Sequence, residues 1–390
     1  MNNQLILLDK AESGLRLEKI QRQMTQRAID AMLVADNATV YYLTGRVFDG
    51  YIYLTATDDP LYFVRRPIGL KDSRLHYLRK PEEIPSLIGE KPAKLALELD
   101  VQSYSVIERL KKLFPEAKIE NASPVIRQAR ACKTEVEIER IRLSGFRQDR
   151  VYRHIPKLFR DGMTDLELQI EIERFSRLEG CLGQFRISGQ SMELYMGNVL
   201  AGENADTPTP YDFAMGGEGA DPSLPVGANG TIIERGMSIM VDVNGNYTGY
   251  MTDMTRTFAP EQLPSLAVKA HQTSIDICHA LADMAVPGIE AAEMYRRAEQ
   301  MAAEAGLSEY FMGHRQKAGF VGHGVGIEIN ELPVIAPRSR DIIAVGNVFA
   351  LEPKFVIPKV GAVGIENTYV VNQDSTECLT TTPEEIIYLL

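Results

Sequence analysis

Residues 239–258 read IMVDVNGNYTGYMTDMTRTF, a sequence typical of a β-hairpin. Two β-rich runs carry Asp242 and Asp253, and the turn-forming residues 244–249 lie between them. The midpoint between the two aspartates falls at Tyr247-Thr248, so a wide turn there would join the two runs. We therefore expect one hairpin that brings Asp242 and Asp253 near each other across its strands, although the sequence does not fix the register.

A second pair of acidic residues follows the same logic. Glu352 lies in Ala-Leu-Glu-Pro and Glu366 in Gly-Ile-Glu-Asn-Thr, and the loop between them contains Pro353, Pro358 and Gly361. Taken singly, such an acid is more often a solvated turn residue or a helix cap. Two acid pairs on two hairpins instead favour a shared binding site.

One histidine completes the candidate set. His323 stands in Gly-His-Gly-Val-Gly, where the glycines allow the backbone to approach a ligand or another strand. Each acid lies in or beside an apolar run, where an unpaired charge would cost several kcal/mol or take up a proton. Four carboxylates and one imidazole suit two Mn, Fe, Co or Zn ions better than one structural zinc. The set is typical of a two-metal hydrolase.

The composition restricts the partners of the protein. The chain has 390 residues, 45% of them hydrophobic, which is enough for two or three domains with their own cores. Its formal charge of −11 and pI near 5.2 argue against nucleic acid or an acidic membrane surface as the main partner.

The sequence also indicates a compartment. The first thirty residues are charged and lack the apolar core of a signal peptide, and no run of about 18 apolar residues occurs. The cysteines show no Cys-x-x-Cys spacing, so we expect free thiols at Cys132, Cys181, Cys278 and Cys378. We expect a cytoplasmic protein.

The first part of the chain alternates helical and strand patterns. Ala11–Arg27 has the periodicity of an amphipathic helix, and residues 31–34 and 51–55 have the composition of strands. This alternation predicts an α/β unit.

A domain boundary is expected near residues 125–133. Ser123-Pro124 breaks the preceding pattern, and Thr134 with Glu137 has the spacing of a capping box that opens a new helix. We divide the chain into domains 1–130 and 131–390.

The second domain contains a weak internal repeat. Gly162 and Gly180 bracket one helical pattern, and Gly288 and Gly306 bracket another at the same offset. Helices that open and close on glycine are common, so coincidence is the alternative. A true repeat would pack two αβ halves about a pseudo-twofold axis, with a site between them.

These motifs resemble, in order and spacing, those of the pita-bread metallopeptidase family, which includes methionine aminopeptidase, aminopeptidase P and prolidase. The resemblance rests on DMTRTF at 253–258, GHGVG at 322–326 with ELP at 331–333, LEP at 351–353 and IE at 365–366. Residues 37–45, NATVYYLTG, resemble the smaller domain of the aminopeptidase P, prolidase and creatinase branch. The implied fold is α/β (α+β), with a small N-terminal creatinase-like α/β domain followed by a pita-bread domain of pseudo-twofold αβ halves.

The resemblance also implies a dinuclear centre. Two divalent ions would be bridged by Asp242, Glu352 and Glu366, with Asp253 and His323 completing the ligand set. Manganese is the first expectation, and zinc, cobalt and iron are the alternatives. Glu352 is the candidate base that accepts a proton from the attacking water and passes it to the leaving nitrogen.

The chain departs from the family pattern at several positions. Active members usually carry two further histidines, and here those positions align with Asn330 and Val226. Asparagine can donate a hydrogen bond to substrate, whereas valine supplies only an apolar wall. His314 is a candidate replacement imidazole, so His314, Asn330 and Val226 form the expected substrate-binding set. Gly364 stands where many proline-specific members have a larger, often basic, residue.

The leading functional prediction is an exopeptidase that cleaves short peptides at Xaa-Pro bonds, as an aminopeptidase or dipeptidase. One alternative is a hydrolase of a small non-peptide amide or amidine, as in creatinase and ectoine hydrolase. The other is a catalytically silent peptide-binding relative. The resemblance further implies a homodimer.

Overall fold

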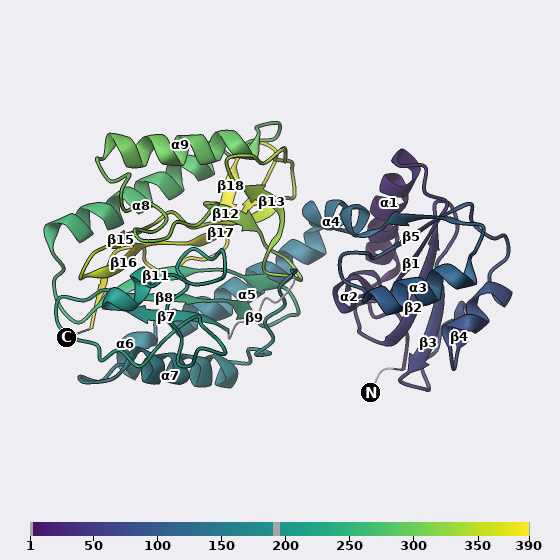
Figure 1. Ribbon diagram of the computed structural model, residues 1–390, viewed down its shortest axis with the longest axis horizontal. Coiled ribbons are helices and arrows are strands. Elements are labelled where there is room, and N and C mark those ends of the chain that lie inside the picture. Colours follow the sequence, from purple (N-terminus) through teal and green to yellow (C-terminus); the bar gives the residue numbers. More distant parts are fainter. Residues whose placement is uncertain (1–2, 190–195, 390) are drawn as a thin grey trace. The chain divides into compact units, whose positions relative to one another are not determined.

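The structure is a computed structural model that describes residues 3–189 and 196–389. The chain divides into two compact units, Met1–Arg130 and Ala131–Leu390. Figure 1 shows that each unit is built on β-sheets of its own with helices packed against them.

The first unit is built on a six-stranded mixed sheet with the order β4-β3-β2-β1-β5-β6. Strand β1 is antiparallel to β2 and parallel to β5. The expected α/β unit is confirmed, because the predicted helix and both predicted strands are present. Its elements are α1 Lys10–Gln26, β1 Ala31–Val34, α2 Asn37–Thr44, β2 Asp49–Thr55, β3 Leu61–Arg66, β4 Leu75–Tyr77, η1 Pro81–Ser86, β5 Lys94–Leu97, α3 Tyr104–Leu113, β6 Lys118–Asn121 and α4 Ser123–Ala131.

The second unit contains two larger sheets between two groups of helices (Figure 1). One sheet has the order β19-β11-β8-β7 and the other β13-β12-β14-β17-β18. The elements of the first half are α5 Glu135–Tyr152, α6 Ile155–Leu158, α7 Asp165–Leu178, β7 Gly197–Ala201, η2 Gly202–Asp206, β8 Ile239–Val243, β9 Gly245–Asn246, β10 Met251–Thr252 and β11 Thr255–Ala259. Those of the second half are α8 Ser265–Met284, α9 Ala291–Glu304, β12 Gly322–Gly324, β13 Glu331–Ile335, β14 Val348–Leu351, β15 Lys354–Ile357, β16 Gly361–Gly364, β17 Asn367–Val371, β18 Thr376–Cys378 and β19 Ile387–Tyr388.

The helix starts that the sequence predicts in this unit are confirmed. Thr134 caps α5, and its backbone N–H donates in turn to Glu137 at 3.0 Å, which completes the capping box. The two helices of the proposed repeat are α7 and α9, which begin shortly after Gly162 and Gly288. Helices α5 to α7 form one group and helices α8 and α9 form the other, and each group lies on the outer side of one of the two larger sheets (Figure 1).

The first predicted hairpin is present, and its register is now defined. Thr255 pairs with Asp242, and Met251 pairs with Asn246 on the inner strands β9 and β10. Asp253 is two residues from the partner of Asp242, so the two aspartates are diagonal neighbours on one face of the hairpin. The sequence predicted their proximity correctly.

The second predicted hairpin places its two acids directly opposite each other. Leu351 pairs with Asn367 on β14 and β17, and Lys354 pairs with Gly364 on β15 and β16 in the same register. Glu352 therefore faces Glu366. The two hairpins meet at this point, because the backbones of Thr255 and Glu366 exchange hydrogen bonds of 3.1 and 3.3 Å.

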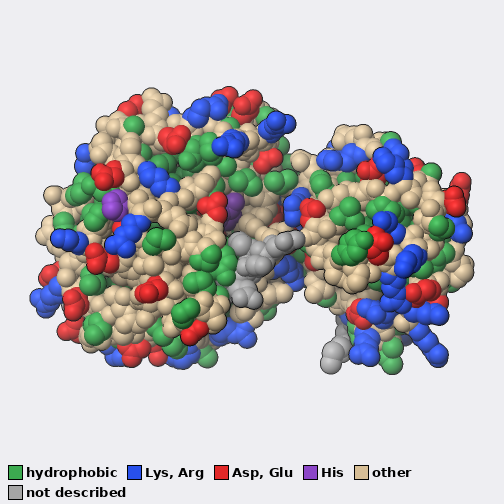
Figure 2. All heavy atoms as spheres, in the orientation of Figure 1, with side chains coloured by type: hydrophobic (Ala, Val, Ile, Leu, Met, Phe, Trp, Pro, Cys, Tyr) green, Lys and Arg blue, Asp and Glu red, His purple; other side chains and the backbone are tan. Residues whose placement is uncertain are grey.

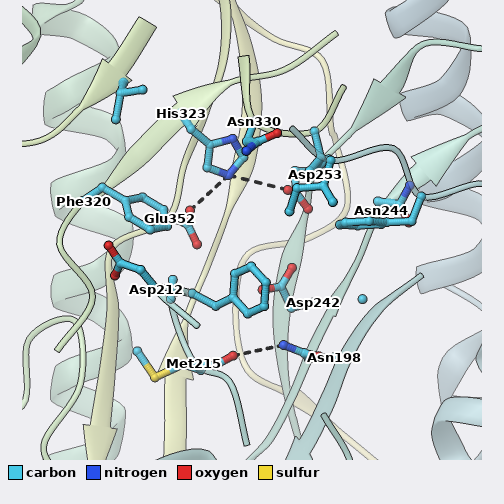
Figure 3. Close-up of a pocket in the computed structure, with 17 residues that line it drawn as sticks. Asn198, Asp212, Met215, Asp242, Asn244, Asp253, Phe320, His323, Asn330 and Glu352 are labelled. Atoms are coloured by element: carbon cyan, nitrogen blue, oxygen red, sulfur yellow. Dashed lines mark hydrogen bonds and ion pairs between the residues drawn. The ribbon is translucent and has the colours of Figure 1, made fainter. Parts of the chain in front are cut away.

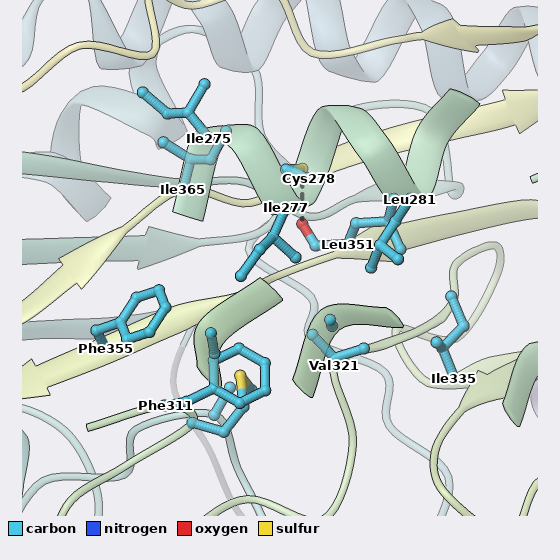
Figure 4. Packing of buried hydrophobic residues seen from close by; sticks show 14 of the residues in the cluster. Ile275, Ile277, Cys278, Leu281, Phe311, Val321, Ile335, Leu351, Phe355 and Ile365 are labelled. Carbon is cyan, nitrogen blue, oxygen red and sulfur yellow. Dashed lines mark hydrogen bonds between the residues drawn. The ribbon is translucent and has the colours of Figure 1, made fainter. Parts of the chain in front are cut away.

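Helix α8 supports the second hairpin from behind. Ile277, Cys278 and Leu281 of α8 pack into the hydrophobic core that includes Leu351 and Ile365 (Figure 4). Ser274, in the same helix, is fully buried; its hydroxyl donates to the carbonyl of Pro353 and accepts from the N–H of Ile365 at 3.0 Å. One serine thus fixes the residues next to both Glu352 and Glu366.

The surface of the second unit carries both charge signs. Acidic and basic side chains are interspersed over the face shown in Figure 2, among hydrophobic and uncharged residues. Among the described residues, no helix has both the length and the apolar content to cross a membrane.

Replacing Ser274 by alanine tests this support. Ser274→Ala leaves a buried amide and a buried carbonyl without their partner, which should cost about 1–3 kcal/mol in the free energy of unfolding. Urea denaturation measures this cost. Gln272→Ala, at an exposed position on the same helix, is the matched control and should change stability by less than about 0.5 kcal/mol. Equal effects of the two variants would contradict the assigned role.

Candidate metal centre

Five polar side chains from five segments converge in the second unit. Asp242 is on β8, Asp253 follows β10, His323 is on β12, Glu352 follows β14, and Glu366 precedes β17. Their side chains are largely buried, from 1% exposed for Glu366 to 20% for Asp242. Figure 3 shows Asp242, Asp253, His323 and Glu352 around one pocket. The structure therefore brings together all five predicted metal ligands.

The glycines beside His323 are required by the close approach of neighbouring strands. A Cβ atom at Gly324 would lie 2.2 Å from the carbonyl oxygen of Leu332, and one at Gly322 would lie 2.4 Å from that of Ala350. Any other residue would push β12 away from β13 or β14. The Gly-His-Gly motif thus fixes the imidazole inside the sheet.

The five residues form two groups of ligand atoms that could each hold a metal ion. One group is Asp253, His323 and Glu366, and the other is Asp242, Glu352 and Glu366. Within each group the ligand atoms lie within 4.8 Å of one another. Glu366 is the one residue common to both, whereas the sequence comparison suggested that Asp242 and Glu352 bridge as well.

Lys354, which belongs to none of the predicted ligand positions, lies among the carboxylates of the second group. The Nζ of Lys354 donates to Asp242 Oδ2 at 2.8 Å, Glu352 Oε2 at 2.9 Å and Glu366 Oε2 at 3.1 Å. Its side chain is fully buried. A lysine in an apolar strand is rarely buried without paired carboxylates, and its position in Leu-Glu-Pro-Lys-Phe-Val was the signal available in the sequence.

The carboxylates of the site differ in how strongly neighbouring positive charges stabilise their ionised form. Burial raises the pKa of Asp253 and of Glu366, and the neighbouring carboxylates raise both further. Burial acts in the same direction on Glu352, but Lys354 and His323 outweigh it and hold that pKa at about 2. Positive charge is therefore sufficient around Glu352 and deficient around Asp253 and Glu366.

The first group fits one divalent cation. His323 Nε2 lies 3.8 Å from Asp253 Oδ2 and 3.3 Å from Glu352 Oε1, so these atoms converge on a small space. Glu366 Oε1 is buried and has no hydrogen-bond partner among the described residues. A buried carboxylate oxygen without a partner is costly unless an ion or water meets it. The second group does not fit an ion in the same way, because the Lys354 ammonium already fills it.

A pocket of about 250 Å³ opens onto four of the five predicted ligands, Asp242, Asp253, His323 and Glu352. Its walls are mainly apolar, formed by Phe185, Ile187, Phe213, Phe320, Ile329 and Val334. Its polar lining outside the ligand set includes Asn198, Asp212, Asn244 and Asn330. Phe320 meets the imidazole of His323 edge-on, with ring centroids 5.8 Å apart, and shields it from one side.

Of the three predicted substrate-binding residues, Asn330 lines the pocket, whereas Val226 and His314 do not. Asn330 lines the pocket, but its amide both donates to and accepts from the backbone of Ser188, each at 2.7 Å. Its function in the fold is therefore to hold the segment around Ser188 beside the pocket. Val226 is buried outside the lining residues, in a turn where its N–H donates to Leu224.

His314 also lies outside the pocket lining. Its Nδ1 is 2.9 Å from Asp206 Oδ2, so the imidazole is held by a loop carboxylate rather than by the ligand set. Gly364 lies directly opposite Lys354 on the β15–β16 hairpin, so the residue that departs from the family pattern faces the unexpected lysine.

Two further residues position the acids, and the sequence reading gave them no role. Thr255 Oγ1 donates to Glu366 Oε2 at 2.8 Å. Arg256 is fully buried and donates to the carbonyl of Glu366 at 2.8 Å and to Asn367 Oδ1 at 2.8 Å. Both belong to the Met-Thr-Arg-Thr-Phe run, so this motif orients Glu366 as well as continuing β11.

The imidazole provides a direct test of the metal group. His323→Ala removes one ligand and should weaken divalent-cation affinity by more than about tenfold, since loss of an outer-shell partner alone costs that much. The rise in melting temperature on adding Mn²⁺ should be lost accordingly. His314→Ala is the control and should keep the full rise. A metal-induced rise that survives in His323→Ala would remove His323 from the ligand set.

Two family models together match most of the chain. Residues 139–373 match the model of metallopeptidase family M24, and residues 16–132 match the creatinase/prolidase N-terminal domain. The resemblance inferred from the motifs is confirmed, as is the mixed α/β architecture with a creatinase-like first domain and a pita-bread second domain.

Curated relatives and solved structures extend over nearly the whole chain. An Xaa-Pro dipeptidase of Pyrococcus horikoshii is 27% identical over 380 residues, covering 95% of this chain and 98% of that protein. An Xaa-Pro dipeptidase structure from Bacillus anthracis has a TM-score of 0.80 at 22% identity, covering 96% and 99% of the two chains. A prolidase structure from Pyrococcus horikoshii has a TM-score of 0.77 at 24% identity, covering 95% and 99%. These structures share the fold of this chain.

Proposed function

The chain belongs to metallopeptidase family M24, and on that premise we propose that it is an exopeptidase that cleaves short peptides at Xaa-Pro bonds. The observation that carries the proposal is that the five ligand positions come together in one site, where four of them line a pocket. Curated relatives named Xaa-Pro dipeptidase, at 27% and 26% identity, support the same substrate class.

The proposed reaction assigns distinct tasks to the residues of the pocket. Asp253, His323 and Glu366 would hold a divalent cation, which when bound polarises a carbonyl and acidifies water. The aromatic and aliphatic walls would exclude bulk water and hold the proline ring. Glu352 remains the proposed base, although the Lys354 ammonium 2.9 Å away lowers its basicity.

The charges of the pocket favour a substrate amine over a substrate carboxylate. The lining includes Asp212, Asp242, Asp253 and Glu352, and no lysine or arginine is among its described residues. A free α-amino group would be attracted to this acidic lining, whereas the free carboxylate of a dipeptide would be repelled. We therefore propose aminopeptidase-like use of longer or amidated Xaa-Pro peptides ahead of free dipeptides.

A second candidate is hydrolysis of a small non-peptide amide or amidine. The observation that favours it is the absence of a second imidazole from the described lining, since Asn330 is bonded to Ser188 and Val226 lies elsewhere. Manganese as the native ion, a homodimer and a cytoplasmic location stay predictions.

A substrate panel tests the proposal. Mn-, Co- and Zn-loaded protein should hydrolyse Xaa-Pro-amides and Xaa-Pro tripeptides faster than the matching free Xaa-Pro dipeptides, because only the dipeptides bring a carboxylate next to the acids. Glu352→Gln should lower kcat by about 10²–10⁴-fold, the usual contribution of a general base.

Glu293→Gln, at an exposed position on α9, is the matched control and should retain full activity. Retained turnover in Glu352→Gln would remove Glu352 as the base. Faster hydrolysis of free dipeptides would contradict the amine-based preference. No hydrolysis of any proline peptide by the metal-loaded protein would favour the non-peptide substrate.

A further inference from the structure

We propose that the ammonium group of Lys354 permanently replaces one of two metal ions, so that this site holds a single divalent cation. The inference concerns metal content alone and does not depend on which substrate the protein hydrolyses. Two sets of residues, the partners of Lys354 and the ligands of one candidate ion, are identical. The carboxylates that surround Lys354 Nζ are the same three that form one of the two candidate cation groups.

The ammonium satisfies this group completely. A lysine ammonium has three N–H donors, and each is used here by a different carboxylate, at 2.8, 2.9 and 3.1 Å. These distances are those of charge-assisted hydrogen bonds. The side chain is fully buried, so water does not compete for the donors. The arrangement places one positive charge where a metal ion would otherwise meet Asp242, Glu352 and Glu366.

A second ion could enter this group only by displacing the lysine, and the backbone leaves little freedom for that. Lys354 is anchored in β15, where it pairs with Gly364 of β16. The hairpin is so closely packed that a Cβ atom at Gly364 would lie 3.1 Å from the Cα of Lys354 and 2.8 Å from the carbonyl oxygen of Pro353. A displaced ammonium would remain buried without carboxylate partners, which is strongly unfavourable.

The charge balance also favours one ion. Four carboxylates surround the site: Asp242, Asp253, Glu352 and Glu366. Lys354 and one divalent cation together supply three positive charges, which nearly neutralise the acids. Adding a second divalent ion beside the ammonium would bring like charges to within a few ångströms of each other in a buried site, where screening by water and salt is weak.

The other group keeps the features of an open cation site. Asp253, His323 and Glu366 present ligand atoms within 4.8 Å of one another. Of these three residues, Glu366 accepts a hydrogen bond from Lys354, and it does so through Oε2. Glu366 Oε2 accepts from Lys354 and Thr255, whereas Oε1 is buried with no hydrogen-bond partner among the described residues. Glu366 therefore joins the built-in cation to the position of the exchangeable one.

Metal counting on the full chain tests this inference. The purified protein is stripped with a chelator, reloaded with excess Mn²⁺, desalted and analysed by elemental mass spectrometry and by electron paramagnetic resonance. Wild-type protein should retain about one ion per chain and give the hyperfine pattern of an isolated Mn²⁺. Two ions with an exchange-coupled spectrum, or no ion, would overturn the proposal.

A variant of the lysine tests the cause. Lys354→Met keeps an unbranched side chain, one heavy atom shorter, but removes the ammonium, so the three carboxylates become free to hold a second ion. The variant should gain a second ion per chain and a coupled spectrum. Lys359→Met, at an exposed position in the β15–β16 turn, is the matched control and should keep one ion.

A folded Lys354→Met protein that still binds only one ion would show that the ammonium does not exclude the second. If Lys354→Met fails to fold even with Mn²⁺ present, the wild-type count and spectrum decide the matter alone. Because neither measurement uses a peptide, their failure is distinguishable from failure of the proposed peptidase activity.

Discussion

Four carboxylates gathered in one largely buried site are the constraint on which this structure depends. Asp253, Glu352 and Glu366 are buried and Asp242 is partly exposed, and together they would repel one another strongly without nearby positive charge. The chain meets this requirement with Lys354 on one side, and the proposed function requires a divalent cation on the other. The two hairpins, the Gly-His-Gly strand and helix α8 can be understood as the framework that keeps these charges within reach of one another.

Buried hydrogen bonds connect this framework to the core of the second unit. Thr255 and Glu366 link the hairpins through their backbones, and Ser274 of α8 bonds to the neighbours of both glutamates. Arg256 then ties the backbone of Glu366 to the C-terminal segment through the carbonyl of Thr382, 2.7 Å away. The ligands are therefore positioned by buried hydrogen bonds on strands and helices, which are more rigid than surface loops.

Much of this arrangement could be predicted from the sequence, for physical reasons. The turn residues after Asp242 and the apolar runs on either side define a hairpin, and the glycines around His323 signal close backbone packing. The positions of Val226 and His314 could not be predicted in the same way. Both lie in turns and loops, where periodicity gives no information on which way a side chain points. The role of Lys354 is not evident from the sequence, because Asp242 and Glu366 lie far from it along the chain, although a lysine in Leu-Glu-Pro-Lys-Phe-Val is unusual for a buried strand.

The presence of Lys354 changes how the family resemblance is applied. All five ligand positions are filled, so a comparison of motifs alone implies two ions, yet one ion position coincides with the ammonium. The most direct measurement is a crystal structure of Mn²⁺-soaked protein with anomalous scattering recorded at the manganese edge. We expect one anomalous peak, among Asp253, His323 and Glu366, with the Lys354 side chain in place. Two peaks, with Lys354 displaced from Asp242 and Glu352, would contradict it.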